Sequence, residues 1–274
     1  MIDLHLHTTA SDGRCSPTEL VDRACAAGVT VMAVTDHDTT AAIIQTREAA
    51  RRRHIDVIAG IEITAVDDGR DVHLLGYFID DTYPPLAVFL SRQRETRIAR
   101  VEQMAERLAR LGMPVDVGAL LTRARHDSGR QVGRPHIARA MIDAGYVADM
   151  REAFDQWLVA DRPAFVPRVG VSAQAVIALV HEAAGKVSLA HPGQTRIDAR
   201  IEDYARAGLD ALEIYHPDHD AASTRRYREM ADRLNLLVTG GSDFHGDASH
   251  GWEPGSVALP ADDWRRFRDA VAHA

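Results

Sequence analysis

The chain has 274 residues, of which 46% are hydrophobic and 26% are charged, the balance of an average soluble globular protein. No uncharged stretch approaches the roughly 18 apolar residues that a membrane helix needs, which excludes a membrane protein. The two cysteines, Cys15 and Cys25, are too few for a disulfide framework, and the N-terminal residues lack the pattern of a secretion signal. We therefore expect a cytoplasmic protein with one large core, or one core that carries an insertion.

The formal net charge is −8, which argues against a protein that coats nucleic acid with its whole surface. The charge is unevenly distributed, because the segment from Arg92 to Arg139 has eleven arginines and only five acidic residues. This distribution predicts a segment that meets an anion. The alternative is a solvated, arginine-rich helical face.

Short β-like runs alternate with amphipathic helical stretches, a pattern typical of βαβ units and a largely parallel sheet. The expected strands cover residues 1–7, 29–35, 56–63, 71–78, 186–191, 209–216, 236–241 and 255–260. A capping box at Ser16 predicts the start of the first helix, and Asp67-Asp68-Gly69 predicts a hairpin turn.

From about residue 83 to residue 166 the alternation stops and the apolar spacing becomes helical. We therefore expect a catalytic barrel formed by residues 1–82 and 167–274, with a helical insertion at 83–166 that covers the site.

Most of the chemistry-bearing residues come at the ends of the expected strands. His5 and His7 are two residues apart on the first strand, so both rings point to the same face. The other candidates at or near strand ends are His37, Glu62, His73, His191, His216, Asp243 and His245. In a parallel barrel these ends open on one rim, where active sites are built.

Each signal is weak alone, since a histidine pair on a strand is more often hydrogen-bonded in the core, and Asp243 alone could cap a helix. Glu62 is harder to explain in that way, because a carboxylate after an apolar strand is costly to bury unless it is paired or ligated. Together these residues indicate a metal site.

The motifs HLHTTASDG at 5–13, LAHPG at 189–193 and GGSDFHG at 240–246, with His37, Glu62 and His73, resemble the four motifs of the PHP (polymerase and histidinol phosphatase) domain family. That family is similar to the amidohydrolase metal enzymes, and the resemblance covers nearly the whole chain. It implies an α/β fold, a distorted, TIM-like (β/α)7 barrel, here with an inserted small all-α subdomain.

The resemblance also implies two or three divalent metal ions. A first ion would be held by His5, His7, Glu62 and Asp243, a second by Glu62, His73 and His191, and a third by Asp12, His37 and His245. Mn²⁺ is the expected metal, and the mixed histidine and carboxylate donors also suit Zn²⁺ or Fe²⁺.

The motif GRPH at 133–136 resembles the branch of the family that acts on nucleoside 3′,5′-bisphosphates and short 5′-phosphorylated RNA. The expected reaction removes the 3′-phosphate of a nucleotide such as adenosine 3′,5′-bisphosphate, giving the 5′-monophosphate, by attack of a metal-bridging hydroxide. Glu62, His191 and Asp243 are the expected catalytic residues. Either His191 or His216 could serve the leaving oxygen, and the sequence does not choose between them.

Arg134 is the candidate for holding the second phosphate, because a guanidinium group meets phosphate with a two-pronged fork. His136 is a second substrate-binding candidate. The alternative for Arg134 is a surface arginine before a helix that starts at Pro135.

Two other functions remain open. One is a 5′→3′ exoribonuclease on short RNA, which the arginine-rich segment favours but which the acidic chain, without an evident aromatic platform, fits poorly. The other is amidohydrolase-type C–N hydrolysis, or a non-catalytic module of a polymerase assembly. The expected partner is a small nucleotide or short RNA, with no membrane and no protein partner implied, and Trp157, Trp252 and Trp264 are expected to be packing residues.

Overall fold

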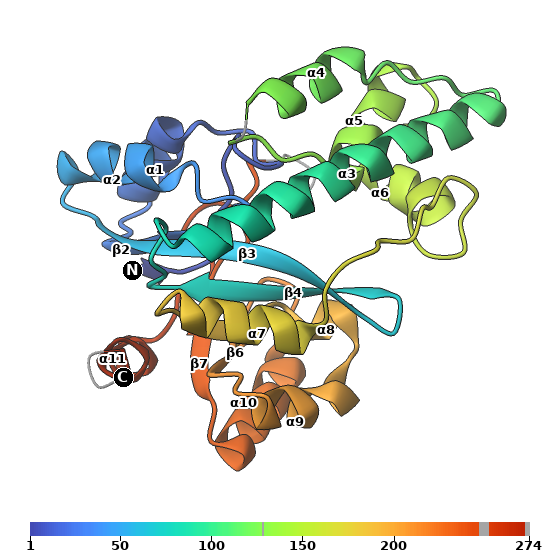
Figure 1. Cartoon of the computed structure of the whole chain (residues 1–274). Coiled ribbons are helices and arrows are strands. Elements are labelled where there is room, and N and C mark those ends of the chain that lie inside the picture. Colours follow the sequence, from blue (N-terminus) through green and yellow to red (C-terminus); the bar gives the residue numbers. More distant parts are fainter. Residues whose placement is uncertain (128, 247–251, 272–274) are drawn as a thin grey trace.

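The structure is a computed structural model of the chain and describes residues 1–127, 129–246 and 252–271. Seven strands pair in sequential order and form a nearly closed barrel (Figure 1). They are β1 (Ile2–Asp3), β2 (Val31–Val34), β3 (Asp56–Asp67), β4 (Arg70–Tyr77), β5 (Lys186–Leu189), β6 (Ala211–Tyr215) and β7 (Leu237–Gly240). The predicted barrel is confirmed.

One strand departs from the parallel arrangement. β4 runs antiparallel to both β3 and β5, whereas the other neighbouring pairs are parallel. The cause is the predicted turn at Asp67-Asp68-Gly69, where Asp68 and Gly69 both have positive φ. The turn joins β3 and β4 directly, without the helical crossover that a parallel pair requires.

The prediction of a last strand at 255–260 is wrong, because these residues form turns and irregular backbone. Leu259 nevertheless donates its N–H to the carbonyl oxygen of Ile2 at 2.9 Å, so the segment runs beside β1 without forming a ladder.

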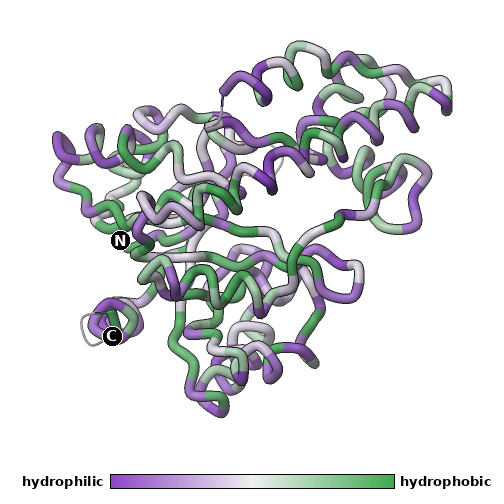
Figure 2. Tube along the Cα trace, in the orientation of Figure 1, coloured by the Kyte–Doolittle hydropathy of each residue, from purple (hydrophilic) through white to green (hydrophobic). Residues whose placement is uncertain are grey.

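Helices cover the outside of the barrel. They are α1 (Pro17–Ala26), α2 (Ile43–Arg51), α7 (Ala173–Glu182), α8 (Pro192–Thr195), α9 (Asp198–Arg206), α10 (Ala221–Leu234) and α11 (Ala261–Asp269). The predicted capping box at Ser16 is present, with Glu19 as its partner. The trace of Figure 2 shows hydrophobic strands surrounded by helices of mixed hydropathy, as expected for a core between barrel and helices.

The helices between β4 and α7 lie together on one side of the barrel, on the side of α3 in Figure 1. They are α3 (Pro84–Arg110), α4 (Gly118–His126), α5 (Arg134–Asp143), α6 (Met150–Ala153) and the π-helix η1 (Phe154–Leu158). They share a hydrophobic cluster of their own, in which Val101, Met104, Leu108, Ile137 and Met141 are fully buried. Within the described part of the chain, no helix is both long and apolar enough to cross a lipid bilayer.

The barrel closes between β1 and β7. Leu4 donates its N–H to the carbonyl oxygen of Gly240 at 3.2 Å. Beside this seam the buried carboxylate of Asp3 accepts hydrogen bonds from the N–H of Ser242 (2.9 Å), its Oγ (2.6 Å) and the N–H of Gly255 (2.7 Å). Burial raises the pKa of Asp3 to about 6, although these donors favour the ionised form. One carboxylate therefore ties the first strand to the last strand and to the C-terminal segment.

Replacement of Asp3 should weaken the seam. In Asp3→Ala several buried N–H and O–H donors lose their acceptor, and we expect the free energy of unfolding at pH 8 to fall by about 3 kcal/mol. Ser242→Ala removes only the hydroxyl contact and should cost about 1 kcal/mol. Urea unfolding of both variants measures the difference, and equal losses would contradict this role of Asp3.

Candidate metal centre

The residues expected at the strand ends come together at one edge of the barrel. His5 and His7 follow β1, His37 follows β2, and His191 follows β5. His73 lies in the first half of β4. Because β4 is antiparallel, its beginning lies where the parallel strands end, so His73 reaches the same cluster.

The carboxylate of Glu62 is the centre of this cluster. It is 1% exposed and lies within 3.4 Å of five imidazole rings. Its Oε2 contacts His5 Nε2 (3.4 Å), His7 Nε2 (3.3 Å) and His37 Nδ1 (3.0 Å), and its Oε1 contacts His73 Nδ1 (2.7 Å) and His191 Nε2 (3.1 Å). The two oxygens of one carboxylate therefore serve two separate groups of histidines.

A second carboxylate, Asp243, faces the first of these groups. Its Oδ1 lies 3.2 Å from Nε2 of His5 and 3.2 Å from Nε2 of His7, and its Oδ2 lies 3.4 Å from Nε2 of His216. His216 thus joins the cluster at its edge, through Asp243.

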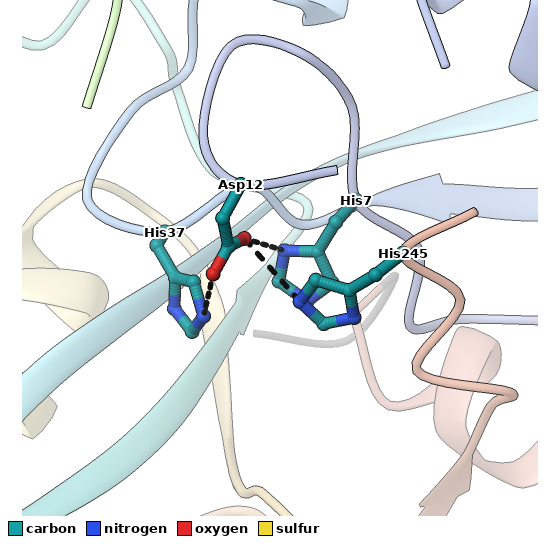
Figure 3. Close-up of side chains that lie close together, drawn as sticks. All are labelled: His7, Asp12, His37 and His245. Carbon is teal, nitrogen blue, oxygen red and sulfur yellow. Dashed lines mark ion pairs between the residues drawn. The ribbon is translucent and has the colours of Figure 1, made fainter. Parts of the chain in front are cut away.

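The third group of side chains surrounds Asp12. Figure 3 shows its carboxylate between His37 on one side and His7 and His245 on the other. Its Oδ1 is 3.3 Å from His245 Nε2 and 3.9 Å from His7 Nδ1, and its Oδ2 is 3.7 Å from His37 Nε2. His7 and His37 each turn one ring nitrogen toward Asp12 and the other toward Glu62.

These donors fit divalent metal ions. Three sets have ligand atoms that all lie within 4.8 Å of one another, namely His5, His7 and Asp243; His37, Glu62 and His73; and His7, Asp12, His37 and His245. Among the described residues, several buried atoms of the cluster lie close to a partner but make no hydrogen bond of good geometry, including His7 Nε2, His37 Nδ1, His73 Nδ1 and Asp12 Oδ1. Buried polar atoms without hydrogen bonds are costly unless something ligates them, and mixed nitrogen and oxygen donors suit Mn²⁺, Zn²⁺ or Fe²⁺.

The pKa values of the carboxylates and of His73 are shifted in the direction that metal binding requires, whereas those of His5, His7, His191 and His245 are raised. Burial alone would raise the pKa of Glu62, but His37, His73 and His5 hold it well below its ordinary value. Burial lowers the pKa of His73 to about 4, despite its contact with Glu62. Burial also opposes the charge of His245, yet Asp12 and Asp243 raise its pKa to about 10. At neutral pH His73 is therefore neutral, whereas His245 holds a proton that a metal would displace.

Sequence reasoning missed Glu213, a fully buried carboxylate in β6. Its Oε1 lies 2.9 Å from His5 Nδ1, and its Oε2 accepts the backbone N–H of His191 at 2.8 Å. Such carboxylates orient metal-binding histidines. The available signal was the one that singled out Glu62, an acidic residue within an apolar strand.

The backbone is strained where these strands end. His191 (φ 26°), Asp38 (φ 51°) and Asp243 (φ 49°) all have positive φ, which non-glycine residues seldom adopt. Strain of this kind is concentrated at functional sites, where the surrounding structure holds it in place.

Beside the histidines lies a cavity of about 570 Å³, lined by residues of the cluster and by arginines that include Arg97, Arg134 and Arg168. Arg134 contacts Asp71 Oδ2 at 3.1 Å and lies over the ring of Phe154. His136 lies two residues further along α5, where its Nδ1 accepts the N–H of Gly133 at 3.3 Å. Trp252, expected as a packing residue, is 37% exposed and lines the same cavity.

Comparison with known proteins agrees with this geometry. The PHP domain model matches residues 3–96. A 5′-3′ exoribonuclease of Escherichia coli is 35% identical over 250 residues, 89% of this chain and 84% of the relative. A 3′,5′-nucleoside bisphosphate phosphatase of Chromobacterium violaceum is 33% identical over 259 residues, 93% and 90% of the two chains. A phosphoribosyl 1,2-cyclic phosphate 1,2-diphosphodiesterase of Eggerthella lenta is 35% identical over 251 residues, 89% and 94% of the two chains.

A solved structure from Bifidobacterium adolescentis, assigned as a metal-dependent phosphoesterase, is 33% identical and superposes with a TM-score of 0.87 over 96% of this chain and 94% of that one. The fold and the histidine and carboxylate cluster define a metal-dependent phosphoesterase. The chain belongs to the PHP domain family, as its motifs predicted.

Metal binding should release protons. Since the pKa of His245 is raised to about 10, its ring is protonated at pH 8 in the metal-free protein and must lose that proton to become a ligand. Titration of chelator-treated protein with Mn²⁺ in two buffers of different ionisation enthalpy should reveal release of at least about one proton per chain. Affinity should fall as the pH is lowered, and a buffer-independent binding enthalpy would contradict the prediction.

Proposed function

We propose that the protein hydrolyses the 3′-phosphate of nucleoside 3′,5′-bisphosphates, such as adenosine 3′,5′-bisphosphate, to the 5′-monophosphate. The observation that carries this proposal is a single cavity with the metal-binding cluster on one wall and arginines on another. Such a cavity suits a small substrate with two anionic groups, one at the reacting centre and one held at a distance. The named activity of the Chromobacterium violaceum relative supports it.

The cluster would hold two or three ions, with Mn²⁺ as the first candidate. The split of Glu62 supports a bridging role, because Oε2 faces His5 and His7 and Oε1 faces His73 and His191. Asp243 would complete the first set. Asp12, His37 and His245 would hold a third ion, which the contacts of Asp12 support.

When bound, such ions lower the pKa of a shared water and neutralise the phosphate oxygens. The protein's own residues would do the rest. Glu62, 1% exposed, and the buried histidines keep the donors in place and limit the access of other water. Glu213 fixes the ring of His5 and the backbone of His191.

The proton for the leaving 3′-oxygen would come from His216. Its Nδ1 accepts the N–H of Asp218 at 3.1 Å, so the neutral ring carries its proton on Nε2. Nε2 faces Asp243, and His216 lines the cavity. His191 is the weaker candidate, because its Nε2 faces Glu62 and would itself be a ligand of the second ion, whereas His216 is not one of the proposed ligands.

Arg134 would hold the 5′-phosphate. It lines the cavity, and its guanidinium group lies over the ring of Phe154, 5.7 Å from the centroid. His136 would act one step away, by capping the start of α5 through Gly133 and so positioning Arg134. In this arrangement the helices of 83–166 form an insertion that covers a barrel of 1–82 and 167–274.

The second candidate function is a 5′→3′ exoribonuclease on short 5′-phosphorylated RNA. The named activity of the Escherichia coli relative favours it, and so does the exposed ring of Trp252 at the cavity, which could stack on a base. C–N hydrolysis of the amidohydrolase type is the third, and the arginines of the cavity favour a phosphate over an amide.

A substrate comparison tests the proposal. The Mn²⁺-loaded protein should release phosphate from adenosine 3′,5′-bisphosphate faster than it cleaves a 5′-phosphorylated trinucleotide or an N-acyl substrate. Glu62→Gln should lose about one equivalent of bound metal and about a thousandfold in rate, because Gln offers one ligand oxygen where Glu offers two. Metal analysis and phosphate release measure both effects. Preferred cleavage of the trinucleotide would instead favour the exoribonuclease.

Arg134→Ala should lower the activity only toward substrates that carry a 5′-phosphate. Loss of a charge-assisted hydrogen bond to the 5′-phosphate should lower kcat/KM for the bisphosphate by about thirtyfold, or roughly 2 kcal/mol. A nucleoside 3′-monophosphate, which lacks the second phosphate, should lose much less. Arg123→Ala, on the exposed side of α4, serves as the control for the loss of positive charge. Equal losses on both substrates would place Arg134 at the reacting phosphate or in folding.

A further inference from the structure

A group of buried arginines lies next to the metal-binding cluster, and the carboxylates that pair with them are too few to neutralise their charge. Asp71, in β4, receives three guanidinium groups: Arg134 Nη2 at 3.1 Å, Arg168 Nε at 3.3 Å and Arg100 Nη1 at 3.5 Å. Asp38 pairs with Arg97 Nε at 2.5 Å and lies 3.8 Å from Arg168 Nη1. Four guanidinium groups and two carboxylates leave an excess of two positive charges.

This excess is buried. The side chains of Arg97, Arg100 and Arg168 are 6% to 7% exposed. Burial, together with repulsion from Arg97, lowers the pKa of Arg168 to about 9, and burial lowers that of Arg100 to about 10. Arg168 Nε and Arg100 Nη2 are buried and make no hydrogen bond of good geometry. Buried donors and uncompensated charge of this kind favour the binding of one more anion.

The position of the group says where that anion lies. Arg97, Arg134, Arg168 and Asp71 all line the cavity that contains the metal-binding cluster. Asp71 and His73 are two residues apart on β4, so their side chains lie on the same face of the strand. An anion held by the arginines is therefore adjacent to, and separate from, a phosphate at the metal-binding cluster.

We propose that Arg97, Arg134 and Arg168 form a receptor for a terminal phosphate, and that Asp71 sets its preference for the dianion of a monoester over the monoanion of a diester. This inference rests on the proposed function and deepens it, because it names the end of the substrate that is read.

The preference follows from charge balance. A terminal phosphate carries close to two negative charges above pH 7 and neutralises the excess, whereas a diester carries one and leaves a buried positive charge. Asp71 holds the excess at two. Without its charge the excess becomes three, all anions bind more tightly, and a diester is no longer at the same disadvantage.

The test compares two matched ligands at pH 8, adenosine 5′-monophosphate and its methyl ester, by calorimetry on the full chain with and without Mn²⁺. Wild-type protein should bind the monophosphate at least about tenfold more tightly in both conditions, because the receptor consists of the chain's own arginines. Arg168→Gln should lower the affinity for the monophosphate by about tenfold or more. Arg168→Lys should lower it less, because lysine keeps the positive charge and loses only the two-pronged hydrogen bonding. Asp71→Asn should raise the affinity for the methyl ester and reduce the ratio of the two affinities.

Two exposed substitutions are the controls, Arg123→Gln in α4 and Asp143→Asn at the end of α5, and both should leave the two affinities unchanged. Equal binding of the two ligands by wild-type protein would overturn the proposal, as would a preference that disappears when Mn²⁺ is removed. Wild-type affinity of the Arg168→Gln protein for the monophosphate would also overturn it. Failure of the Mn²⁺-loaded protein to hydrolyse the bisphosphate, with the binding preference intact, would count against the proposed reaction and not against the receptor.

Discussion

The burial of one carboxylate organises the barrel edge. Glu62 is removed from water in the middle of β3, and an isolated charge there would be costly. Five imidazole rings from the ends or beginnings of four other strands surround it and keep its pKa low. The five rings reach Glu62 only because the strands that carry them present these residues at the same edge of the barrel. The seam at Asp3 and the centre at Glu62 are two parts of that single arrangement.

The antiparallel hairpin is the feature that connects the two charged regions of the cavity. Its first strand brings in Glu62 and Thr64, and its second strand brings in Asp71 and His73. Thr64 accepts a hydrogen bond from Arg97 Nη2 at 3.0 Å, so the long helix α3 is attached to the same hairpin. A parallel β4 would have placed His73 and Asp71 away from the edge, and Arg100 and Arg134 would have lost their carboxylate partner.

The sequence predicted the histidines of the cluster together with Glu62 and Asp243 because their signal is local, a polar residue at or near the end of an apolar run. Asp12 came from the family resemblance, and Glu213 was missed. The sequence also predicted the hairpin, whose turn residues are adjacent in the chain. Arg97 and Arg168 had no such signal, since they are 71 residues apart in an arginine-rich chain and come together at Asp38. The prediction of a strand at 255–260 was wrong, although its local signal was clear. A β-like composition cannot show that β1 already pairs with β2 and lies beside β7, so that no edge of β1 is left for another strand.

The two regions of the cavity are unbalanced in the same sense. With three divalent ions the metal-binding cluster would carry more positive charge than its four carboxylates Glu62, Asp243, Asp12 and Glu213 offset, and the arginine group has more guanidinium groups than acids. A ligand with one phosphate neutralises one region and leaves the other desolvated and charged, whereas a ligand with two phosphates neutralises both. If the proposed reaction holds, selectivity for a doubly phosphorylated substrate would need no contact with the base. It follows from the separation of two buried positive sites on one hairpin, with Asp71 two residues from His73.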